Sequence, residues 1–509
     1  PGTYHPSVVV TDSLSATGMT NSTLVVDPIT PEVTAVSPIS PAGLPLGLAT
    51  LTATVTGTPT DWDWDFGTGA DPSTSTAENP EVTLQNPGTY AGSVTVTNGA
   101  GTSNFPFEYV VAVPVAPAWL VTRLEQAEGG DPGEKGYISA IVANDRMAVF
   151  HRGPTGALRL AHAQVENPSS PADWTLVTVD PDPSVLIGAH SAAVCIDKLC
   201  VIYLKNPDFG TPEVWFARAT TANPTGPDDW VRYIIDSPST WSYNWLAIYA
   251  QDDGMAIAWR GSDLPQSKPH FGWTNATTTS TSAADWDFHT LPFLSAVGQC
   301  AGVYQLSLVE DQLYALFQNT GGSGAFHLLT RTTTFPPTDE TDWMDPVRIT
   351  PGSGVTGTAP ASMGVIDDRL TVIYQTGGPF KTNVVLRRAD GPTLEESTTW
   401  TTVTDLPKPD VTTTVETGLN LVGGRLALIT RDFGDGSPSA SHQIGVIRQI
   451  RVDPAETPAS VTWEYAALGP DPVMGDHCRL VVLSSGAMAV ACIDKDTSEL
   501  RVAIAQGPY

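Results

Sequence analysis

Histidine, tyrosine and arginine side chains stand at the borders of short apolar runs along most of the chain. His190 and Tyr243 lie where two of these runs begin, and Arg260 ends a third. A guanidinium can neutralise a carboxylate, while an imidazole or a phenol beside it can remove a neighbouring proton. If the fold brings these three side chains together, they are candidate catalytic residues for proton abstraction from an anionic substrate.

Further side chains of the same types occupy equivalent borders and are candidate binding residues. They are His151, Arg152, Lys205, Tyr304, Arg431, His477 and Arg479. The whole chain carries 54 acidic and 25 basic residues, which gives a net charge of −29. A local group of cations in so acidic a chain favours an anionic or polyhydroxyl ligand. The simpler alternative is that these side chains only line a wet channel.

The elements that carry these residues are predicted to be β-hairpins. Two apolar runs flank a tight turn at Asn144-Asp145, at Asp367-Asp368 and at Gly423-Gly424. A third apolar run follows, as in residues 157–163, and a fourth run opens with tryptophan after a polar loop. We expect the start of the first strand and the end of the second to converge on one face, where the candidate residues lie.

The tryptophans that open the fourth run recur at a nearly fixed interval. Trp174, Trp230, Trp286, Trp343, Trp400 and Trp463 are separated by 56, 56, 57, 57 and 63 residues, and Trp119 precedes the first by 55. Such a period in an all-β pattern predicts propeller blades. Seven hairpins and seven tryptophan runs predict a seven-bladed β-propeller over residues 115–509, closed by the orphan Trp119 run as an outer strand. On outer strands, the tryptophans are not candidates for stacking on a ligand.

A different module precedes the propeller. Residues 28–114 alternate polar and apolar side chains around Trp64-Asp65-Phe66-Gly67, and Pro87-Gly88-Thr89-Tyr90 follows further on. This pattern resembles the PKD domain, an Ig-like β-sandwich, although Gly67-Thr68-Gly69 replaces the usual Gly-Asp-Gly. The resemblance implies that Trp62, Trp64 and Asp65 are structural. It also implies that the module is a spacer or adhesive unit of an extracellular protein.

Residues 1–27 are predicted to be the C-terminal part of another PKD-like domain. Pro1-Gly2-Thr3-Tyr4 repeats the motif at Pro87–Tyr90, and two apolar runs follow it. A chain that begins inside a module predicts a larger multi-module parent or a surface assembly. The predicted fold class is therefore all-β, with Ig-like sandwich modules followed by a propeller.

Four of the five cysteines are candidates for disulfide bonds. Cys195 and Cys200 flank a two-residue turn predicted at Asp197-Lys198, which would place them opposite each other in a non-hydrogen-bonded pair. Cys478 and Cys492 are predicted on neighbouring strands of the last blade. Two disulfides suit a secreted protein. Buried thiols are the alternative.

Charge and composition exclude several functions. The negative charge argues against nucleic acid or an anionic membrane surface as partner, and no apolar stretch is long enough for membrane insertion. Histidine-rich metal spacing, Cys-x-x-Cys pairs and phosphate-binding glycine loops are missing from the sequence, so no cofactor is expected. Residues 432–437 have the composition of a calcium loop without its later glutamate, which leaves structural calcium as an alternative to a plain glycine turn.

The predicted architecture resembles the propellers of sialidases and polysaccharide lyases. The Asp-box Ser-x-Asp-x-Gly-x-Thr-Trp is missing from every blade, which argues against a sialidase. We predict an extracellular or cell-surface binding and assembly protein, in which the propeller recognises a polysaccharide or a cell-surface protein and the PKD modules act as spacers. The resemblance implies an alternative, a secreted polysaccharide lyase or glycoside hydrolase that acts on an anionic polysaccharide in the channel mouth.

Overall fold

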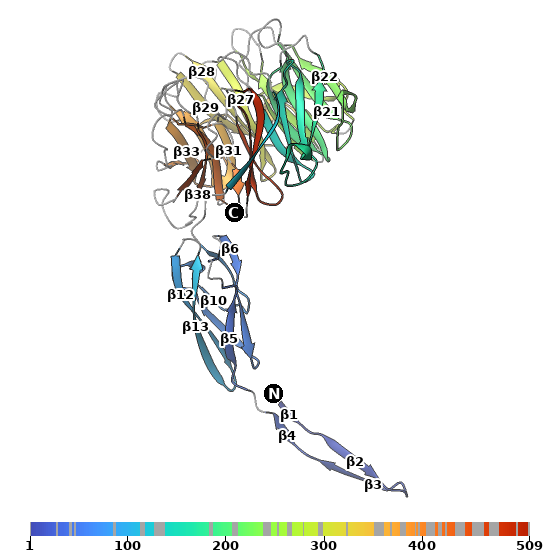
Figure 1. The fold of residues 1–509 in the computed structure, drawn as a ribbon, viewed down its shortest axis with the longest axis vertical. Helices are drawn as coiled ribbons and strands as arrows, with labels where there is room; N and C mark the ends of the chain where they lie inside the picture. The colour runs from blue at the N-terminus through green and yellow to red at the C-terminus, as the bar shows by residue number, and fades with distance from the viewer. Residues whose placement is uncertain are drawn as a thin grey trace. The chain divides into compact units, whose positions relative to one another are not determined.

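The computed structural model divides into two compact units at the boundary between Val115 and Ala116. The residues that it describes are 2–26, 29–39, 43–44, 47–84, 88–111, 118–126, 138–182, 187–205, 212–237, 246–251, 254–261, 267–277, 279–293, 299–321, 324–350, 361–366, 369–376, 383–391, 393–394, 398–403, 413–415, 420–422, 425–432, 443–449, 463–467, 478–494 and 497–506. Throughout these ranges the regular structure is β-strand with short 3-10 turns, and no α-helix occurs in them (Figure 1). No helix within them has the length and apolar character to cross a membrane.

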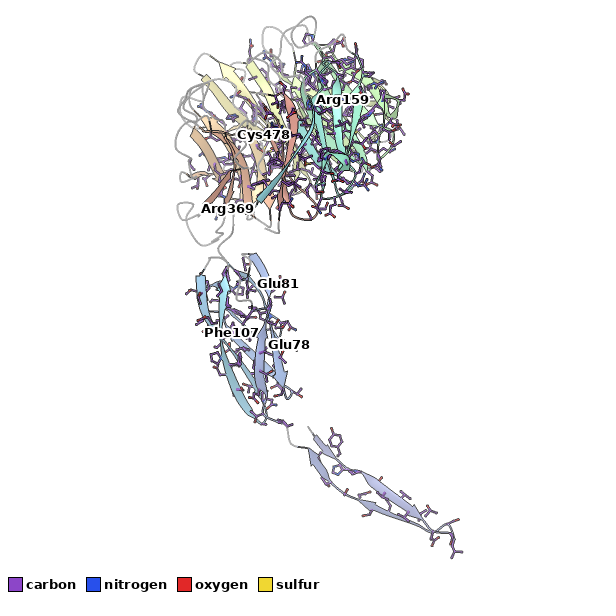
Figure 2. All side chains as sticks on the ribbon, in the orientation of Figure 1. Glu78, Glu81, Phe107, Arg159, Arg369 and Cys478 are labelled. Carbon is purple, nitrogen blue, oxygen red and sulfur yellow. The ribbon has the colours of Figure 1, made fainter. Side chains whose placement is uncertain are left out.

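The first unit contains an Ig-like sandwich. Its strands are β5 (Glu32–Ser37), β6 (Gly47–Thr50), β7 (Thr52–Thr56), β8 (Asp61–Asp65), β9 (Ala70–Asp71), β10 (Thr74–Ser75), β11 (Glu81–Leu84), β12 (Gly88–Asn98) and β13 (Gly101–Val111). One sheet has the order β10-β8-β12-β13, and a second has the order β6-β11-β9. Trp64 and Phe66 are fully buried in the apolar core of this unit, which also contains Phe107 (Phe107 is labelled in Figure 2). The Tyr109 hydroxyl donates a 2.7 Å hydrogen bond to the Phe66 carbonyl, and Asp65 Oδ1 accepts the Gly67 N–H, so this motif is structural as expected.

The N-terminal residues form a hairpin that repeats the pairing of β12 with β13. Its strands are β1 (Gly2–Tyr4), β2 (Ser7–Thr11), β3 (Thr17–Asn21) and β4 (Leu24–Val26). Gly2 pairs with Val26 as Gly88 pairs with Val111, and the two registers stay matched along both hairpins. Val8 and Val10 are more than half exposed here, whereas their equivalents on β12 are buried.

The second unit contains seven antiparallel sheets in its described part. The closing sheet joins β14 (Ala118–Gln126) to β42 (Glu499–Gln506), β41 (Met488–Ile493) and β40 (Arg479–Val482). The other six sheets follow in chain order and are numbered 1 to 6. Sheet 1 contains β15 (Ile138–Ala143), β16 (Arg146–Arg152), β17 (Leu158–Ala163) and β18 (Trp174–Asp180); sheet 2 contains β19 (Ile187–Cys195), β20 (Lys198–Lys205), β21 (Glu213–Ala219) and β22 (Trp230–Asp236); and sheet 3 contains β23 (Ala247–Gln251), β24 (Gly254–Arg260), β25 (Pro269–Thr274) and β26 (Asp287–Thr290). Sheet 4 contains β27 (Gln299–Val309), β28 (Gln312–Gly321), β29 (Gly324–Arg331) and β30 (Val347–Arg348); sheet 5 contains β31 (Ala361–Ile366), β32 (Arg369–Thr376), β33 (Asn383–Ala389) and β34 (Trp400–Val403); and sheet 6 contains β35 (Thr413–Val415), β36 (Asn420–Val422), β37 (Arg425–Asp432), β38 (Gln443–Gln449) and β39 (Trp463–Ala467).

The sheets of this unit contact one another in a closed circuit, which makes the unit a β-propeller. First strands pack in series from β15 through β19, β23 and β27 to β31, and sheet 5 then contacts β35. The circuit returns through β36 and β40 to β15. Among the described residues, apolar clusters fill the spaces from the closing sheet through sheet 5, so sheets 1 to 4 are covered on both faces. The expected role of the Trp119 run is confirmed, because β14 forms the outer strand of the closing sheet and pairs with β42.

Three of the repeat tryptophans pack against a phenylalanine of the preceding sheet. Trp230, Trp286 and Trp343 meet Phe150, Phe216 and Phe271 edge to face, with ring centroids 5.1 to 6.0 Å apart. Trp174, Trp230, Trp286 and Trp343 are only 5 to 8 % exposed. These side chains are therefore core residues and are not available to a ligand.

A capped turn sets the point at which the tryptophan strand begins. In sheet 1, one oxygen of Asp173 accepts hydrogen bonds from the backbone N–H groups of Ser169 and Ser170. Asp229, Asp285 and Asp342 repeat this arrangement just before their tryptophans. These bonds hold the pKa of each aspartate below its ordinary value, because they favour the ionised carboxylate.

Neither predicted disulfide is present, since all five cysteines are buried thiols. The predicted turn at Asp197-Lys198 is displaced by one residue, because Ile196 and Asp197 adopt the positive φ angles. Cys195 therefore pairs with Lys198, and Cys200 pairs with Ala193. Cys200 instead faces Met255, with 3.8 Å between the sulfurs. Cys478 and Cys492 both pack in the apolar core of the closing sheet, where a thiol behaves as a small hydrophobic group.

Candidate functional site

The predicted functional residues that the structure describes lie toward the same end of the sheets that carry them, and we call it the site end. In sheet 1, Ile138 at the start of the first strand pairs with His151 at the end of the second. Leu158 at the start of the third strand pairs with Asp180 at the end of the fourth. At the site end, the first and third strands begin and the second and fourth strands end, as expected from the hairpin pattern.

At the junction between the closing sheet and sheet 1, one carboxylate contacts an imidazole and a guanidinium. Glu125 of β14 lies 2.8 Å from His151 Nε2 and accepts two hydrogen bonds from Arg159, at 2.7 and 3.2 Å (Arg159 is labelled in Figure 2). Burial alone would raise the pKa of Glu125, but these two contacts outweigh it and hold the pKa below its ordinary value. His151 is fully buried, so it does not face an external ligand.

The junction between sheets 1 and 2 has the same plan. Asp180, at the end of β18, lies 2.6 Å from Lys205 Nζ and accepts a 2.8 Å hydrogen bond from the Tyr203 hydroxyl. Lys205 also stands 3.7 Å from the centre of the Trp215 ring. Burial, and then the neighbouring Asp180 charge, raise the pKa of Tyr203 well above its ordinary value, so the hydroxyl stays a donor. Lys205 is buried and Asp180 balances its charge, so we interpret it as a structural cation.

The junction between sheets 2 and 3 repeats the arrangement a third time. The Trp259 indole donates a 2.8 Å hydrogen bond to Asp236 Oδ2, and His270 Nδ1 lies 4.0 Å from the same oxygen. Asp236 and His270 keep 30 and 23 % of their side-chain surfaces exposed. This junction is the most open of the three to solvent.

Glu125, Asp180 and Asp236 were missed among the candidate residues, although the sequence contains their signal. Each stands six residues after a repeat tryptophan, namely Trp119, Trp174 and Trp230. Their ring partners His151, Tyr203 and Trp259 occupy equivalent places near the ends of the second strands. The repeated acid was hidden because its partner changes from imidazole to phenol to indole, which no single motif describes.

The junction between sheets 3 and 4 lacks that carboxylate. Pro292 stands six residues after Trp286, and the aromatic partner position is taken by Phe317, which is fully buried. Arg260 lies at this junction and donates a 3.1 Å hydrogen bond from Nη2 to Ser267 Oγ. Burial lowers the pKa of the Arg260 guanidinium, with the nearby Cys300 acting in the opposite direction. Burial raises the pKa of Cys300 to about 12, so this thiol is neutral near pH 7.

His190 contacts a serine of the neighbouring first strand. Its Nδ1 lies 2.8 Å from Ser139 Oγ, and the same hydroxyl donates a 2.8 Å hydrogen bond to the His190 carbonyl. His190 is 6 % exposed and Ser139 is likewise 6 % exposed. The imidazole is thus held in a defined orientation near the site end of sheet 2.

Tyr304 belongs to a polar and aromatic group on sheets 4 and 5. Its hydroxyl donates a 2.8 Å hydrogen bond to Gln318, and the His327 ring lies between Tyr304 and Tyr374 with centroids 5.8 and 5.1 Å away. Tyr374 is equivalent to Tyr203 in the strand pattern, but Ile349 replaces the acid six residues after Trp343. Its hydroxyl accordingly has no hydrogen-bond partner within the described part of the chain.

The remaining predicted residues are placed as follows. Arg152 is buried at the end of β16, and Arg479 donates a 3.0 Å hydrogen bond to the Cys478 carbonyl (Cys478 is labelled in Figure 2). Arg431 lies near the end of β37, where the backbone alone is described. Tyr243 and His477 lie outside the described residues. The structure therefore brings Arg152, His190, Arg260 and Tyr304 to the site ends but does not test the proposed catalytic trio as a whole.

No group of three or more metal-ligating side chains occurs in the described ranges. The predicted calcium loop at 432–437 falls largely outside them.

Comparison with known families identifies the first unit. Residues 31–113 match the family described as PKD domain. That match covers the sandwich β5–β13, in agreement with the resemblance of the Trp64–Gly67 motif. By sequence, no curated protein matches the chain.

Solved structures with similar folds include enzymes, a lectin and a WD40 domain. A thermostable family-43 glycoside hydrolase overlaps 56 % of this chain and 98 % of its own, at 13 % identity and a TM-score of 0.32. The Aleuria aurantia lectin in complex with Fucα1-6GlcNAc overlaps 66 % of this chain and 96 % of its own, at 12 % identity and a TM-score of 0.36. The WD40 domain of SCAP from fission yeast overlaps 82 and 92 %, at 9 % identity and a TM-score of 0.35. The ligands and activities in those titles belong to those proteins.

Proposed function

We propose that the protein is an extracellular glycan-binding protein whose propeller takes its ligand at the site ends. The observation that carries this proposal is the polar character of those ends. In the described part of the propeller, the exposed large apolar side chains lie on outer strands or at the opposite end of the sheets: Val121, Val165, Ile196, Ile234 and Phe288. Protein interfaces centre on buried aromatic or aliphatic anchors, whereas sugars are held by hydrogen-bonding groups. A glycan therefore suits this face better than a protein partner.

The groups available for such a ligand come from several sheets. Arg260 and Tyr304 are partly exposed, whereas His190 and Arg152, toward the same end of sheets 2 and 1, are buried. His151 and Lys205 do not belong to this set, because they are buried against Glu125 and Asp180. The closed circuit of sheets and the pairing of β14 with β42 support seven blades around a common axis, which would direct these groups toward one mouth.

The PKD-type module would serve as a spacer that carries the propeller at a cell surface. The family match at residues 31–113 supports this role. The hairpin of residues 2–26, with its PKD-type register, fits a row of such modules.

The proposal is tested by binding measurements with the full chain. We expect retention of one class of oligosaccharide on a glycan array, followed by saturable binding in calorimetry. Tyr304→Ala should weaken binding at least tenfold. Ile196→Ala, at the opposite end of sheet 2, should leave binding unchanged. Equal weakening by both variants, or no binding across the array, would refute a glycan site at this end.

A second candidate function, a polysaccharide lyase, is favoured by the oriented imidazole of His190. Its place on sheet 2, next to the sheet that carries Arg260, would suit proton removal beside a neutralised carboxylate. The same preparations should then be incubated with uronate polysaccharides. Release of unsaturated product that is lost in His190→Ala, with binding retained, would replace the binding-only proposal by catalysis.

A further inference from the structure

The junction between sheets 2 and 3 leaves its carboxylate more exposed than the two junctions before it. The side chain of Asp236 keeps 30 % of its surface exposed, compared with 13 % for Glu125 and 5 % for Asp180. All three acids stand six residues after a repeat tryptophan. Because their place in the repeat is the same, the difference comes from the side chains around each acid.

Two groups that lie beside the acid between sheets 1 and 2 are replaced by smaller ones between sheets 2 and 3. Lys205 contacts Asp180 and stands over the Trp215 ring. The strand registers place Gly261 where Lys205 stands, and His270 where Trp215 stands. The long ammonium side chain is thus replaced by a hydrogen atom, and the indole by an imidazole.

The outer strand of sheet 3 differs from that of sheet 2 in the same region. Arg232 of β22 donates a hydrogen bond to the Val179 carbonyl and so connects its strand to sheet 1. Phe288 takes the equivalent position on β26, opposite Gly272 instead of Ala217. A Cβ atom on Gly272 would lie 2.6 Å from the Phe288 ring, so the glycine allows the ring to lie across the strand. The Phe288 side chain remains 42 % exposed.

Phe288, Trp259, His270 and Asp236 form one group, which we call the Phe288 cluster. The buried Trp259 ring meets Phe288 and His270 edge to face, with centroids 5.8 and 5.5 Å apart. In the described structure the Asp236 oxygens accept hydrogen bonds from the Trp259 indole and the Ser237 N–H. An ionised carboxylate has about four acceptor positions. Asp236 can therefore accept further hydrogen bonds from its exposed side.

We propose that the Phe288 cluster binds one neutral pyranose residue of a glycan. The face of an aromatic ring is apolar and electron-rich, so the exposed phenyl ring suits the C–H groups on one side of a sugar ring. Asp236 accepts hydroxyl groups of the same sugar, and His270 Nδ1 flanks it 4.0 Å from Oδ2. The Asp236 charge, in a chain with a net charge of −29, repels an acidic sugar.

The inference rests on the proposed glycan function and adds a subsite with its own ligand class. The Phe288 cluster comes from second, third and fourth strands, whereas His190 and Tyr304 belong to first strands. The cluster also combines an apolar ring with a charged acceptor. Sugar residues carry both kinds of surface, while the centres of protein interfaces are depleted of charge. A sugar therefore fits this cluster better than a protein anchor.

The test titrates the full chain with the methyl glycosides of glucose, galactose, mannose and xylose. The methyl glycosides of glucuronic and galacturonic acid serve as charged counterparts of the first two. We expect a neutral glycoside to bind in calorimetry, and saturation-transfer NMR to show the strongest transfer to the protons on one face of its ring. A uronate should bind about tenfold more weakly than its neutral counterpart, and Asp236→Asn should narrow that difference.

The variants assign binding to the ring. Phe288→Ala should weaken binding of the neutral glycoside about tenfold, and Gly272→Ala should weaken it as well because the new methyl group displaces the ring. Ile234→Ala is the matched control and should leave binding unchanged. Ile234 is 40 % exposed on the neighbouring outer strand and pairs with Trp215, which packs between sheets 1 and 2. Thermal unfolding confirms that each variant is folded.

The outcomes separate the subsite from the proposed function. Unchanged affinity in folded Phe288→Ala and Gly272→Ala, or equal weakening by Ile234→Ala, overturns the subsite. Tighter binding of the uronates overturns it too. If a glycan array retains an oligosaccharide but no neutral glycoside binds, the subsite is wrong and the glycan function stands. A blank array counts against the proposed function itself.

Discussion

The hydroxyl of Tyr203 donates a 2.8 Å hydrogen bond to Asp180, and the bond joins the second strand of sheet 2 to the outer strand of sheet 1. Trp259 bonds to Asp236 over the same distance at the next junction. The contact of His151 with Glu125 occupies the equivalent place at the junction before. Three consecutive junctions of the propeller are thus fastened by an acid that follows the repeat tryptophan at a fixed interval.

Removal of the Asp180 carboxylate should strongly destabilise the propeller. Asp180→Ala leaves the buried ammonium of Lys205 without its 2.6 Å partner, and breaking a buried pair from one side costs about 3–5 kcal/mol. Chemical denaturation measures the loss in free energy of unfolding. Asp287→Ala, at an exposed position on β26, is the control. The double variant Asp180→Leu with Lys205→Met should recover much of the loss. If it is as unstable as Asp180→Ala, the uncompensated charge is not the cause.

Glu125→Gln should weaken the closure of the ring. The change removes the negative charge shared by His151 and Arg159, and we expect a loss of about 2 kcal/mol or more. Because the pKa of Glu125 is lowered in the folded protein, its contribution is present above the pKa of the unfolded chain and declines as pH falls through the folded value. Hydrogen exchange of the β14 amides near neutral pH gives the readout. Exchange that is unchanged in the variant would contradict a role in closure.

The repeat pattern of the sequence predicted the propeller because each of its signals is local. The tryptophan interval fixed the outer strands, and Asn144-Asp145 formed the expected turn with two positive φ angles. The structure has the same kind of turn at Ile196-Asp197, but the sequence predicted it one residue later, at Asp197-Lys198. The reason is that isoleucine rarely adopts a positive φ angle, so turn rules do not place it there. Because the turn was predicted one residue too late, Cys195 and Cys200 were predicted to lie opposite each other and to form a disulfide.

The contacts between sheets could not be obtained in this way. Lys205 contacts Asp180, which lies 25 positions earlier on another sheet. The composition of the sequence does not predict which residues of two sheets come into contact. Two of the predicted binding residues, His151 and Lys205, contact Glu125 and Asp180 in the structure, and the sequence pattern did not indicate these contacts.

Lowering the pH should destabilise sheet 1 through a buried histidine. His162 is 1 % exposed, and neither of its ring nitrogens has a hydrogen-bond partner among the described residues. Burial, and then the charge of Arg146, lower the pKa of His162 in the folded protein. The unfolded chain therefore binds the proton first, so stability is complete above about pH 6.5 and falls as the pH drops below it.

His162→Leu should reduce this pH dependence between pH 7 and pH 5, as measured by thermal unfolding at a series of pH values. The matched change His5→Leu, at an exposed position, should leave the dependence unchanged. A His162→Leu curve parallel to that of the unmodified protein would show that another group governs the effect.

All five cysteines should be protected from thiol reagents in the native state. They are buried thiols, and burial raises the pKa of Cys300 to about 12, which suppresses the reactive thiolate. Denaturation without a reductant should then expose all five to alkylation, and intact mass spectrometry counts the labels. Fewer labels until a reductant is added would demonstrate a disulfide and contradict the structure.

Trp286→Ala should destabilise the fold without altering ligand specificity. Trp286 packs 5.3 Å from Phe216 and donates a 2.9 Å hydrogen bond to the Tyr233 hydroxyl between sheets 2 and 3. Loss of a buried tryptophan of this kind costs about 3–5 kcal/mol. Calorimetric unfolding and glycan binding are measured on the same preparation, with Trp286→Phe as the milder control. A change in ligand preference in folded Trp286→Ala would place this tryptophan in the binding site.

The pairing of β14 with β42 affects how the propeller can fold during synthesis on the ribosome, because the two strands lie far apart in the sequence. β14 can pair with β42 only when Gln506 has been made, 388 residues after its partner Ala118. Until then, β14 has an open edge that no neighbouring strand covers, while the intervening sheets can already pack in order. The open edge of β14 is therefore at risk of aggregation while the intervening residues are made, and a chaperone that shields this strand would protect it during that time.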